Sequence, residues 1–146
     1  MTIRELHTKE EMMEQHTVLQ ELYPTLSITD YSKDLDQMLP NNRYFQVAVF
    51  LEEECIGLTG VWIGTKLWSG KYLEIDNLVV CAKYRSKGAG KLLIDYVKNI
   101  AQKEGCSMIA LDSYTTNFQA HKLFYSEGFG PKGFHFIHVL NEEQLR

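Results

Sequence analysis

The stretch LVVCAKYRSKGAGKLLIDYV, residues 78–97, contains the features that decide the fold. It begins as an apolar strand, continues into a cationic turn with the pattern Arg85-x-x-Gly88-x-Gly90, and ends in an amphipathic helix. Helix N-terminal N–H groups, glycines that admit a ligand to the backbone, and nearby cations together form an anion site. A tight turn that needs two glycines explains the same pattern. The turn matches neither the dinucleotide pattern G-x-G-x-x-G nor the P-loop pattern G-x-x-x-x-G-K-[ST].

Strands and helices alternate on both sides of this stretch. The expected elements are a strand at 2–6, helices at 9–22 and 29–39, a hairpin at 44–64, a strand at 71–80, a helix at 88–104, a strand at 106–114, a helix at 117–127 and a final strand at 134–140. Pro24, Pro40 and Gly105 predict where three of the helices end. No repeat or interior linker interrupts this order, so we predict an α/β fold with a single domain over residues 1–146.

Composition excludes several classes of protein. Hydrophobic residues make up 45% of the 146 residues and charged residues 23%, the balance of a soluble globular chain. The apolar stretches 47–51 and 78–82 are far shorter than the roughly 20 residues that cross a bilayer. The N-terminus is charged where a signal peptide is apolar. We therefore expect a cytoplasmic protein without a membrane partner. Cys55, Cys81 and Cys106 are too spread for a disulfide framework or a zinc site, so free thiols and no metal are expected.

The charge is unevenly distributed along the chain. Residues 1–70 hold five Lys/Arg and eleven Asp/Glu, a net of −6, whereas residues 71–146 hold ten and eight, a net of +2. Four cations lie within the nine residues 83–91, which include the turn: Lys83, Arg85, Lys87 and Lys91. A nucleic-acid-binding protein needs a broader basic face, so no nucleic-acid partner is expected. The cluster suits a small phosphorylated ligand, and a solvated loop is the alternative interpretation.

Residues 117–129 carry a second pattern, Asn117-x-x-Ala120 followed by Gly128–Phe129. Leu78-x-Val80 with Arg85-x-x-Gly88-x-Gly90 resembles the acetyl-CoA-binding motif of the GNAT superfamily of N-acetyltransferases. The second pattern resembles that superfamily's motif N-x-x-A-x-x-x-Y-x-x-x-G-F. The two motifs occur in the expected order and separation. The resemblance implies a GNAT-type fold, with a central mixed, mostly antiparallel sheet, about four flanking helices, and a splayed strand pair that holds the cofactor.

The same resemblance implies acetyl-CoA as the acyl-donor cosubstrate and no metal. The backbone of Leu78–Val80 would pair with the pantetheine arm, and the turn from Arg85 to Lys91 would hold the pyrophosphate, mainly through N–H groups. Asn117 would hydrogen-bond the pantetheine or the acyl end, although a helix N-cap is an alternative role for it. The predicted cofactor-binding residues are Leu78, Val79, Val80, Arg85, Ser86, Lys87, Gly88, Ala89, Gly90, Lys91 and Asn117.

An acceptor amine, with a pKa near roughly 10, must lose a proton before it attacks a thioester. Glu74 lies eleven residues before Arg85, where some superfamily members have their general base. Asp76 has the same side-chain parity and is the alternative base. A solvent-facing side chain or a structural ion pair is the other interpretation of Glu74.

The second motif departs from the superfamily pattern at one position. Phe124 stands where the usual tyrosine protonates the departing thiolate, and Tyr125 follows it. Tyr125 is the predicted acid, with packing or a pocket wall as the alternative. Its position is not equivalent to that of Phe124, because one helical step rotates a side chain by about 100°. Because a thiol has a pKa near roughly 8.5, the thiolate is a tolerable leaving group even without an acid.

Together these features predict an acetyl-CoA-dependent N-acetyltransferase that acts on the primary amine of a small molecule by direct attack in a ternary complex. The acidic first half favours a cationic acceptor. Two alternatives stay open: a non-catalytic acyl-CoA-binding module, and a peptide or protein N-acetyltransferase. The oligomeric state also stays open, with a homodimer as one candidate.

Overall fold

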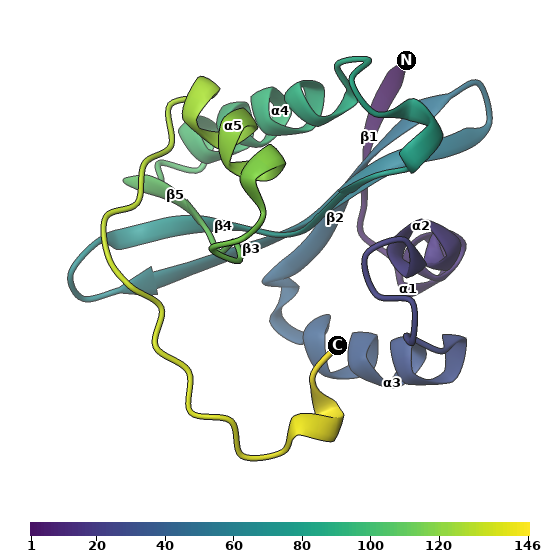
Figure 1. Cartoon of the computed structure of the whole chain (residues 1–146), viewed down its shortest axis with the longest axis horizontal. Helices are drawn as coiled ribbons and strands as arrows, with labels where there is room; N and C mark the ends of the chain where they lie inside the picture. The colour runs from purple at the N-terminus through teal and green to yellow at the C-terminus, as the bar shows by residue number, and fades with distance from the viewer. The chain divides into compact units, whose positions relative to one another are not determined.

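The computed structural model describes residues 1–146 and divides into two compact units, Met1–Leu111 and Asp112–Arg146. The first unit contains the whole sheet, whose strands follow the chain order (Figure 1). They are β1 (Thr2–Leu6), β2 (Tyr44–Leu51), β3 (Glu54–Lys66), β4 (Gly70–Val80) and β5 (Met108–Leu111). The first three pairings are antiparallel and the β4–β5 pairing is parallel. The predicted mixed, mostly antiparallel sheet is therefore confirmed.

Five α-helices accompany this sheet along the chain. They are α1 (Lys9–Met13), α2 (His16–Gln20), α3 (Ile28–Met38), α4 (Ala89–Lys103) and α5 (Phe118–Ser126), with short 3₁₀ turns at Pro40–Asn42, Ala82–Tyr84 and Glu142–Gln144. The single helix expected at 9–22 is wrong in one respect. It is broken at Gln15, where φ and ψ of −98° and 13° leave the helical region. No helix is both long and apolar enough to cross a membrane.

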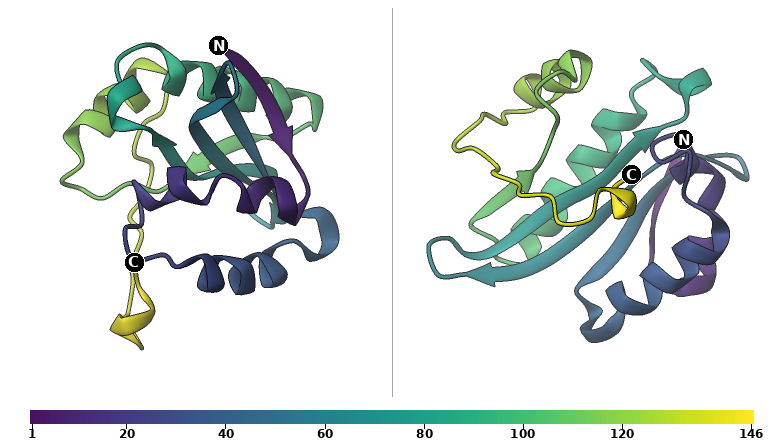
Figure 2. Two further views of the ribbon diagram at one scale, coloured as in Figure 1. Left: turned by 90° about the vertical axis from the view of Figure 1, so that its right-hand side faces the viewer. Right: turned by 60° about the horizontal axis from the view of Figure 1, so that its bottom comes forward.

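The sheet of the first unit separates α4 from the three N-terminal helices (Figures 1 and 2). The stripe that α4 turns to the sheet, Ala89, Leu93, Ile94, Val97 and Ala101, is buried. It covers the face of β3 and β4 that carries Val61, Leu73 and Ile75, all buried as well. Burying a side chain of this size contributes roughly 1.5–3 kcal/mol. Helix α4 is thus fixed against the sheet, and with it the turn that precedes its first residue.

Strand β4 is irregular at the point where the predicted cofactor segment begins. Its register with β3 shifts between the pairs Gly60–Asp76 and Leu58–Val79, so one residue of β3 faces two of β4. Asn77, at the bulge, has φ +53°. The ladder between β4 and β5 ends at the pair Ile75–Leu111, while β4 runs on to Val80. The last five residues of β4 therefore pair only with β3, which agrees with the expected splayed strand pair.

The second unit contains α5 and an extended C-terminal segment. The strand expected at 134–140 is wrong, because the structure has no strand after β5. The apolar side chains that led to this expectation are instead exposed, with Phe134 and Phe136 each 90% accessible and Leu140 93%. Apolar alternation makes a segment capable of pairing, but a strand forms only where a neighbouring strand supplies hydrogen-bond partners.

Candidate functional site

The turn before α4 leads into a helix N-terminus that no side chain caps. Ser86 has φ +60°, and Gly88, the N-cap residue of α4, has φ +89°. No side chain caps the helix, so the N–H groups of its first turn have no capping acceptor from the N-cap residue. A Cβ atom added to Gly88 would meet no atom within 4 Å, but a side chain is strained at this φ. The turn therefore presents unblocked backbone next to a helix N-terminus, as the sequence predicts.

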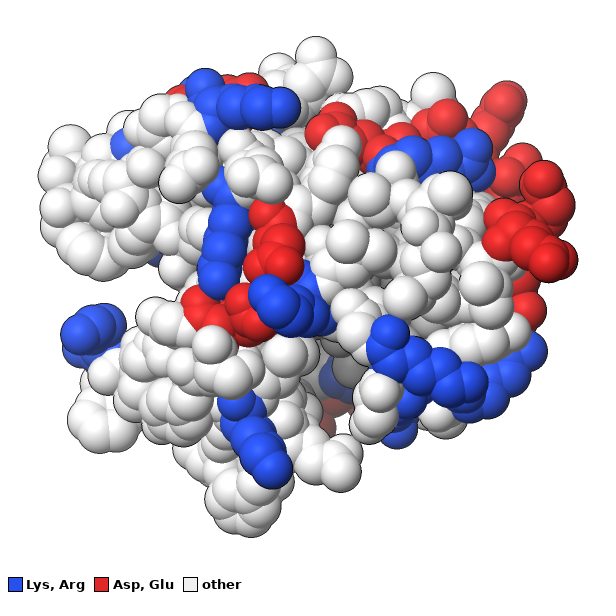
Figure 3. All heavy atoms as spheres, turned by 90° about the horizontal axis from the view of Figure 1, so that it is seen from above, with Lys and Arg blue, Asp and Glu red and all other residues white.

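The lysines of this turn form ion pairs or a cation–π contact with other side chains of the first unit. Lys83 Nζ lies 2.7 Å from Glu54, and Lys91 Nζ lies 2.8 Å from Asp95. The Lys87 ammonium lies 5.5 Å from the centre of the Tyr84 ring. These exposed contacts are weak and can exchange for a more highly charged anion. The face drawn in Figure 3 carries both signs of charge.

Arg85 has a different position, because it links the turn to β4. Its Nε donates to the carbonyl oxygen of Val80 at 3.2 Å, and its guanidinium lies 3.9 Å from Glu21. The same Glu21 carboxylate accepts from the N–H of Ala82 at 2.8 Å. Glu21, Glu54, Cys81 and Lys83 line a shallow hollow of about 330 Å³ beside the turn. Arg85 therefore contributes to the shape of the strand end as well as to its charge.

The second candidate group lies on the face of the sheet opposite α4. Glu74 pairs with Trp62 of β3, and Asp76 pairs with Gly60, so both carboxylates project from the same face. Asp76 is fully engaged: its Oδ2 accepts from Trp62 Nε1 at 3.1 Å and its Oδ1 accepts from the N–H of Asn77 at 2.9 Å. Asp76 therefore holds both the Trp62 indole and the backbone at the bulge, and the choice between Glu74 and Asp76 as the base stays a prediction.

The remaining predicted residues lie in the second unit. Asn117 is the N-cap of α5, where its Oδ1 accepts from the N–H of Ala120 at 3.3 Å, so the capping role is confirmed. Phe124 packs edge-on against Phe129 with ring centres 6.2 Å apart. Tyr125 is 62% exposed. The roles of Asn117 and Tyr125 toward the cofactor stay predictions.

A polar network beside the bulge, buried at Tyr31, Tyr44 and Gln46, was not predicted from the sequence. It joins Tyr23, Tyr31, Tyr44, Gln46 and Asn77 through side-chain hydrogen bonds of 2.9–3.2 Å. One signal was available: Asn77 is a poor strand former that tolerates positive φ, so an asparagine within EIDNLVV is typical of a bulge.

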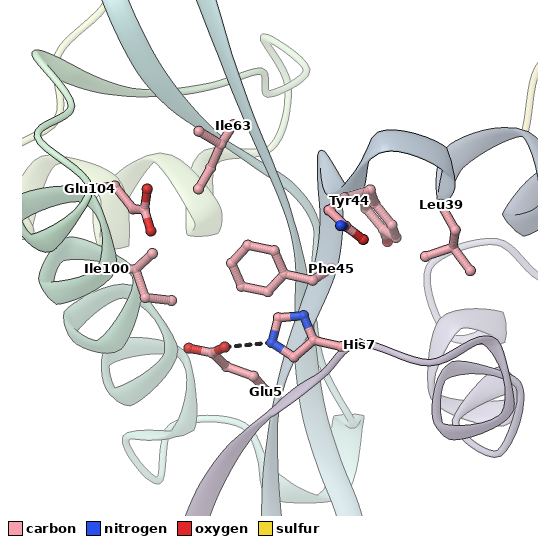
Figure 4. Close-up of a pocket in the computed structure, with 9 residues that line it drawn as sticks. Glu5, His7, Leu39, Tyr44, Phe45, Ile63, Ile100 and Glu104 are labelled. Carbon is pink, nitrogen blue, oxygen red and sulfur yellow. Dashed lines mark hydrogen bonds and ion pairs between the residues drawn. The ribbon is translucent and has the colours of Figure 1, made fainter.

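A further cavity, of about 340 Å³, lies near the C-terminal end of α4 (Figure 4). Phe45, Ile63 and Ile100 form its apolar part. His7 Nε2 and a carboxylate oxygen of Glu5 are hydrogen-bonded at 2.6 Å. Ile100 is eleven residues from Ala89, roughly 16 Å along the helix at 1.5 Å per residue. The cavity is therefore remote from the turn and does not belong to the site described above.

Comparison with known proteins places this fold in a class of acyltransferases. The sequence profile of the acetyltransferase (GNAT) family matches residues 5–129. The uncharacterized N-acetyltransferase YhdJ of Bacillus subtilis (strain 168) is 31% identical over 128 residues, which cover 88% of this chain and 89% of YhdJ. The chain belongs to the acetyltransferase (GNAT) family, and it is an N-acetyltransferase.

Solved structures support the fold. The aminoglycoside acetyltransferase meta-AAC0020, from an uncultured soil metagenomic sample and in complex with sisomicin, has a TM-score of 0.82 at 18% identity, covering 96% of each chain. AAC(6')-Iy in complex with the bisubstrate analogue CoA-S-monomethyl-acetylneamine has a TM-score of 0.82 at 16% identity, covering 97% of this chain and 99% of that one. Ribosomal-protein-alanine N-acetyltransferase from Brucella melitensis biovar Abortus 2308 has a TM-score of 0.80 at 16% identity, covering 96% and 100%.

No group of three or more His, Cys, Asp or Glu side chains is arranged to hold a metal ion. The three cysteines are free thiols. Burial raises the pKa of Cys55 to about 11, so this thiol stays protonated and is a poor nucleophile at neutral pH.

Proposed function

We propose that the protein transfers an acetyl group from acetyl-CoA to the primary amine of a small molecule by direct attack within a ternary complex. One observation carries this proposal. The end of β4 has one unpaired edge, and it leads within nine residues to a helix whose first N–H groups have no side-chain cap. An extended ligand with a phosphorylated end needs both features, one for its arm and one for its phosphates.

The residues present fit a coenzyme A thioester. The backbone of Leu78–Val80 is proposed to pair with the amide groups of the pantetheine arm. The N–H groups from Ser86 to Gly90 are proposed to hold the pyrophosphate, with Arg85, Lys87 and Lys91 adding positive charge. Glu21 lies close to Arg85 and must lose part of that contact when the anion binds.

Acetyl-CoA supplies an activated acyl group with a thiolate leaving group. Glu74 is proposed to accept the proton of the acceptor amine, directly or through water. Its neighbour Trp62 is held through Asp76, so the indole forms a fixed wall beside Glu74. A backbone N–H near Leu78–Val80 is proposed to stabilise the negative charge on the acyl oxygen. Tyr125 is the proposed proton donor to the leaving thiolate, in place of Phe124.

A small cationic amine is the proposed acceptor. Two observations support this choice: the net charge of −6 on residues 1–70, and the half-buried carboxylates of Glu74 and Asp76 on one face of β4. Structural neighbours that bind sisomicin or an acetylneamine analogue act on amines of this kind. The neighbour named for ribosomal-protein alanine acetylation makes a peptide N-terminus the second candidate acceptor.

Release of free CoA from acetyl-CoA tests the proposal, with polyamines, aminoglycosides, amino acids and peptides as acceptors. Glu74→Gln is the test variant, and Glu53→Gln, in the turn of the β2–β3 hairpin, is the matched control. We expect release with at least one small cationic amine, lost in Glu74→Gln and kept in the control. Binding of CoA without release in any arm would identify a non-catalytic module, and release with peptides alone would replace the small-molecule acceptor.

A further inference from the structure

We propose that Asn77 is a positioning residue, and that Tyr23 and Tyr44 hold it so that the bulge aims the backbone of Leu78–Val80 at the cofactor. The inference rests on the proposed function, because it takes this segment to be the cofactor strand. It adds a role for three residues outside both sequence motifs.

The backbone at the bulge needs to be held in place. Asn77 has φ +53°, a conformation that side-chain-bearing residues adopt uncommonly and that asparagine tolerates better than most. Thr59, the residue of β3 that faces the bulge, donates from Oγ1 to the carbonyl oxygen of Asp76 at 2.9 Å. Together with the Asp76 carboxylate on the N–H of Asn77, this bond fixes the entry to the bulge.

The side chain of Asn77 holds the bulge through two further hydrogen bonds. Its Nδ2 donates to the Tyr23 hydroxyl at 2.9 Å, and its Oδ1 accepts from the Tyr44 hydroxyl at 3.2 Å. Gln46 Nε2 donates to the Tyr44 hydroxyl at 3.1 Å and to the Tyr31 hydroxyl at 2.9 Å. Because Tyr44 and Gln46 are 3% and 0% exposed, these bonds are shielded from competition with water.

Gly60 shows that the sheet is shaped around this network. A Cβ atom at position 60 would lie 2.7 Å from the Tyr44 hydroxyl and 2.8 Å from Asn77 Oδ1. Such distances are too short for any side chain, so only glycine lets Tyr44 reach Asn77 across β3. The hydroxyl–amide contact is therefore a built feature of the sheet and not a chance approach.

The network also connects the N-terminal helical region to the proposed cofactor strand. Tyr23 lies between α2 and α3, 54 residues from Asn77 in the sequence. Leu78 follows Asn77 directly and begins the segment with one unpaired edge. A change in the Tyr23 contact therefore acts on the direction of the cofactor strand.

Three variants test the role of Asn77 through the dissociation constant for CoA, measured by calorimetry, and through KM for acetyl-CoA. Asn77→Gly keeps the positive φ and removes both side-chain bonds, and Tyr23→Phe removes one of them. Tyr96→Phe is the control, since it removes a hydroxyl on α4 that donates to Glu5 at 3.3 Å and has no hydrogen bond to the network. One neutral hydrogen bond corresponds to a roughly 2- to 10-fold change in binding.

We expect CoA to bind about 10-fold or more weakly to Asn77→Gly and a few-fold more weakly to Tyr23→Phe. Tyr96→Phe is expected to bind CoA as the wild type does. A lower unfolding temperature with unchanged CoA affinity in both test variants would overturn the inference, since it would show a purely structural network. If Asn77→Gly does not fold, Tyr23→Phe decides alone. If the wild type itself fails to bind CoA, the proposed function fails instead.

Discussion

At the level of single residues, two neighbouring carboxylates on β4 have different surroundings. Asp76 uses both oxygens to hold Trp62 and the bulge, whereas Glu74 stands opposite the indole. Glu74→Gln is expected to lower kcat by roughly 10²–10⁴-fold, the range for loss of a general base. The loss should be largest at low pH, where the acceptor amine is hardest to deprotonate. A pH–rate profile with unchanged CoA affinity is the measurement, and an unaltered profile would remove Glu74 from the mechanism.

Asp76→Asn provides the comparison for that prediction. Asparagine keeps an oxygen for the N–H of Asn77 but offers an amide where Trp62 Nε1 needs an acceptor. We expect a lower unfolding temperature and weaker CoA binding, without the pH-dependent loss that Glu74→Gln shows. A pH–rate profile for Asp76→Asn like that expected of Glu74→Gln would instead make Asp76 the base.

Burial raises the pKa of Tyr96, and two tyrosines of the network beside the bulge should titrate still more abnormally. Burial raises the pKa of Tyr31 to about 12, and burial raises the pKa of Tyr44 as well. Because the folded state holds these protons more tightly than the unfolded state, the resulting stability is present below about pH 10 and is lost as the pH rises toward 12. Tyrosinate absorbance followed with circular dichroism should show two tyrosines that ionise only on unfolding. Ionisation of all eight tyrosines in the folded protein would contradict the buried network.

At the level of elements, the turn before α4 should be sensitive to both shape and charge. Gly88→Val is expected to weaken CoA binding most, because a branched residue at φ +89° costs about 1–3 kcal/mol and blocks approach to the backbone. Arg85→Glu and Lys87→Glu should weaken it less, by opposing the pyrophosphate. Lys103→Glu, in the last turn of the same helix, is the matched charge control. Wild-type CoA affinity in the turn variants would show that these residues form only a turn.

The elements found from sequence are those with a local physical signal. The stripe from Leu92 to Ala101 and the closing Gly105 predicted α4 almost to its ends. Two β-rich runs predicted β2 and β3, and alternation in its first half predicted β4. The break at Gln15 was missed because the apolar spacing continues through both short helices. The strand at 134–140 was wrong because alternation reports the capacity to pair and not the presence of a partner.

The residues of the candidate site also fall into two groups, those with a local sequence signal and those without one. The turn and Asn117 were found because glycine spacing and N-cap chemistry are local in sequence. Trp62 and Tyr44 were missed, because their importance depends on the register between β2, β3 and β4 and on a bulge that shifts it by one residue. Register is set by contacts across the sheet, and a single sequence does not display them.

At the level of the whole molecule, the exposed apolar side chains of residues 134–140 bear on oligomeric state. Five of these residues, Phe134, Phe136, Ile137, Val139 and Leu140, are exposed, and clusters of exposed apolar side chains are typical of interaction sites. We therefore expect the homodimer that the sequence left open, with 134–140 contributing to its interface. Light scattering over a range of concentrations should give twice the 16.9 kDa mass of the chain. Phe134→Ser with Phe136→Ser should reduce association, and a monomer at every concentration would contradict the expectation.

The distribution of charge over the molecule leads to the last prediction. Residues 1–70 carry a net −6, with acidic side chains along α1 and α3, and one of them, Asp36, lies 2.7 Å from Lys9. A negative wall raises the local concentration of cations, and salt screens this effect over about 10 Å at 0.1 M. We expect kcat/KM for the best amine to fall as ionic strength rises. Asp34→Asn or Asp36→Asn should flatten this dependence, because each removes one negative charge from α3. Glu104→Gln, near the opposite end of α4 from the turn, should keep the wild-type slope. A best acceptor that is neutral or anionic, or a slope that no acidic variant changes, would show that these carboxylates only solvate the helices.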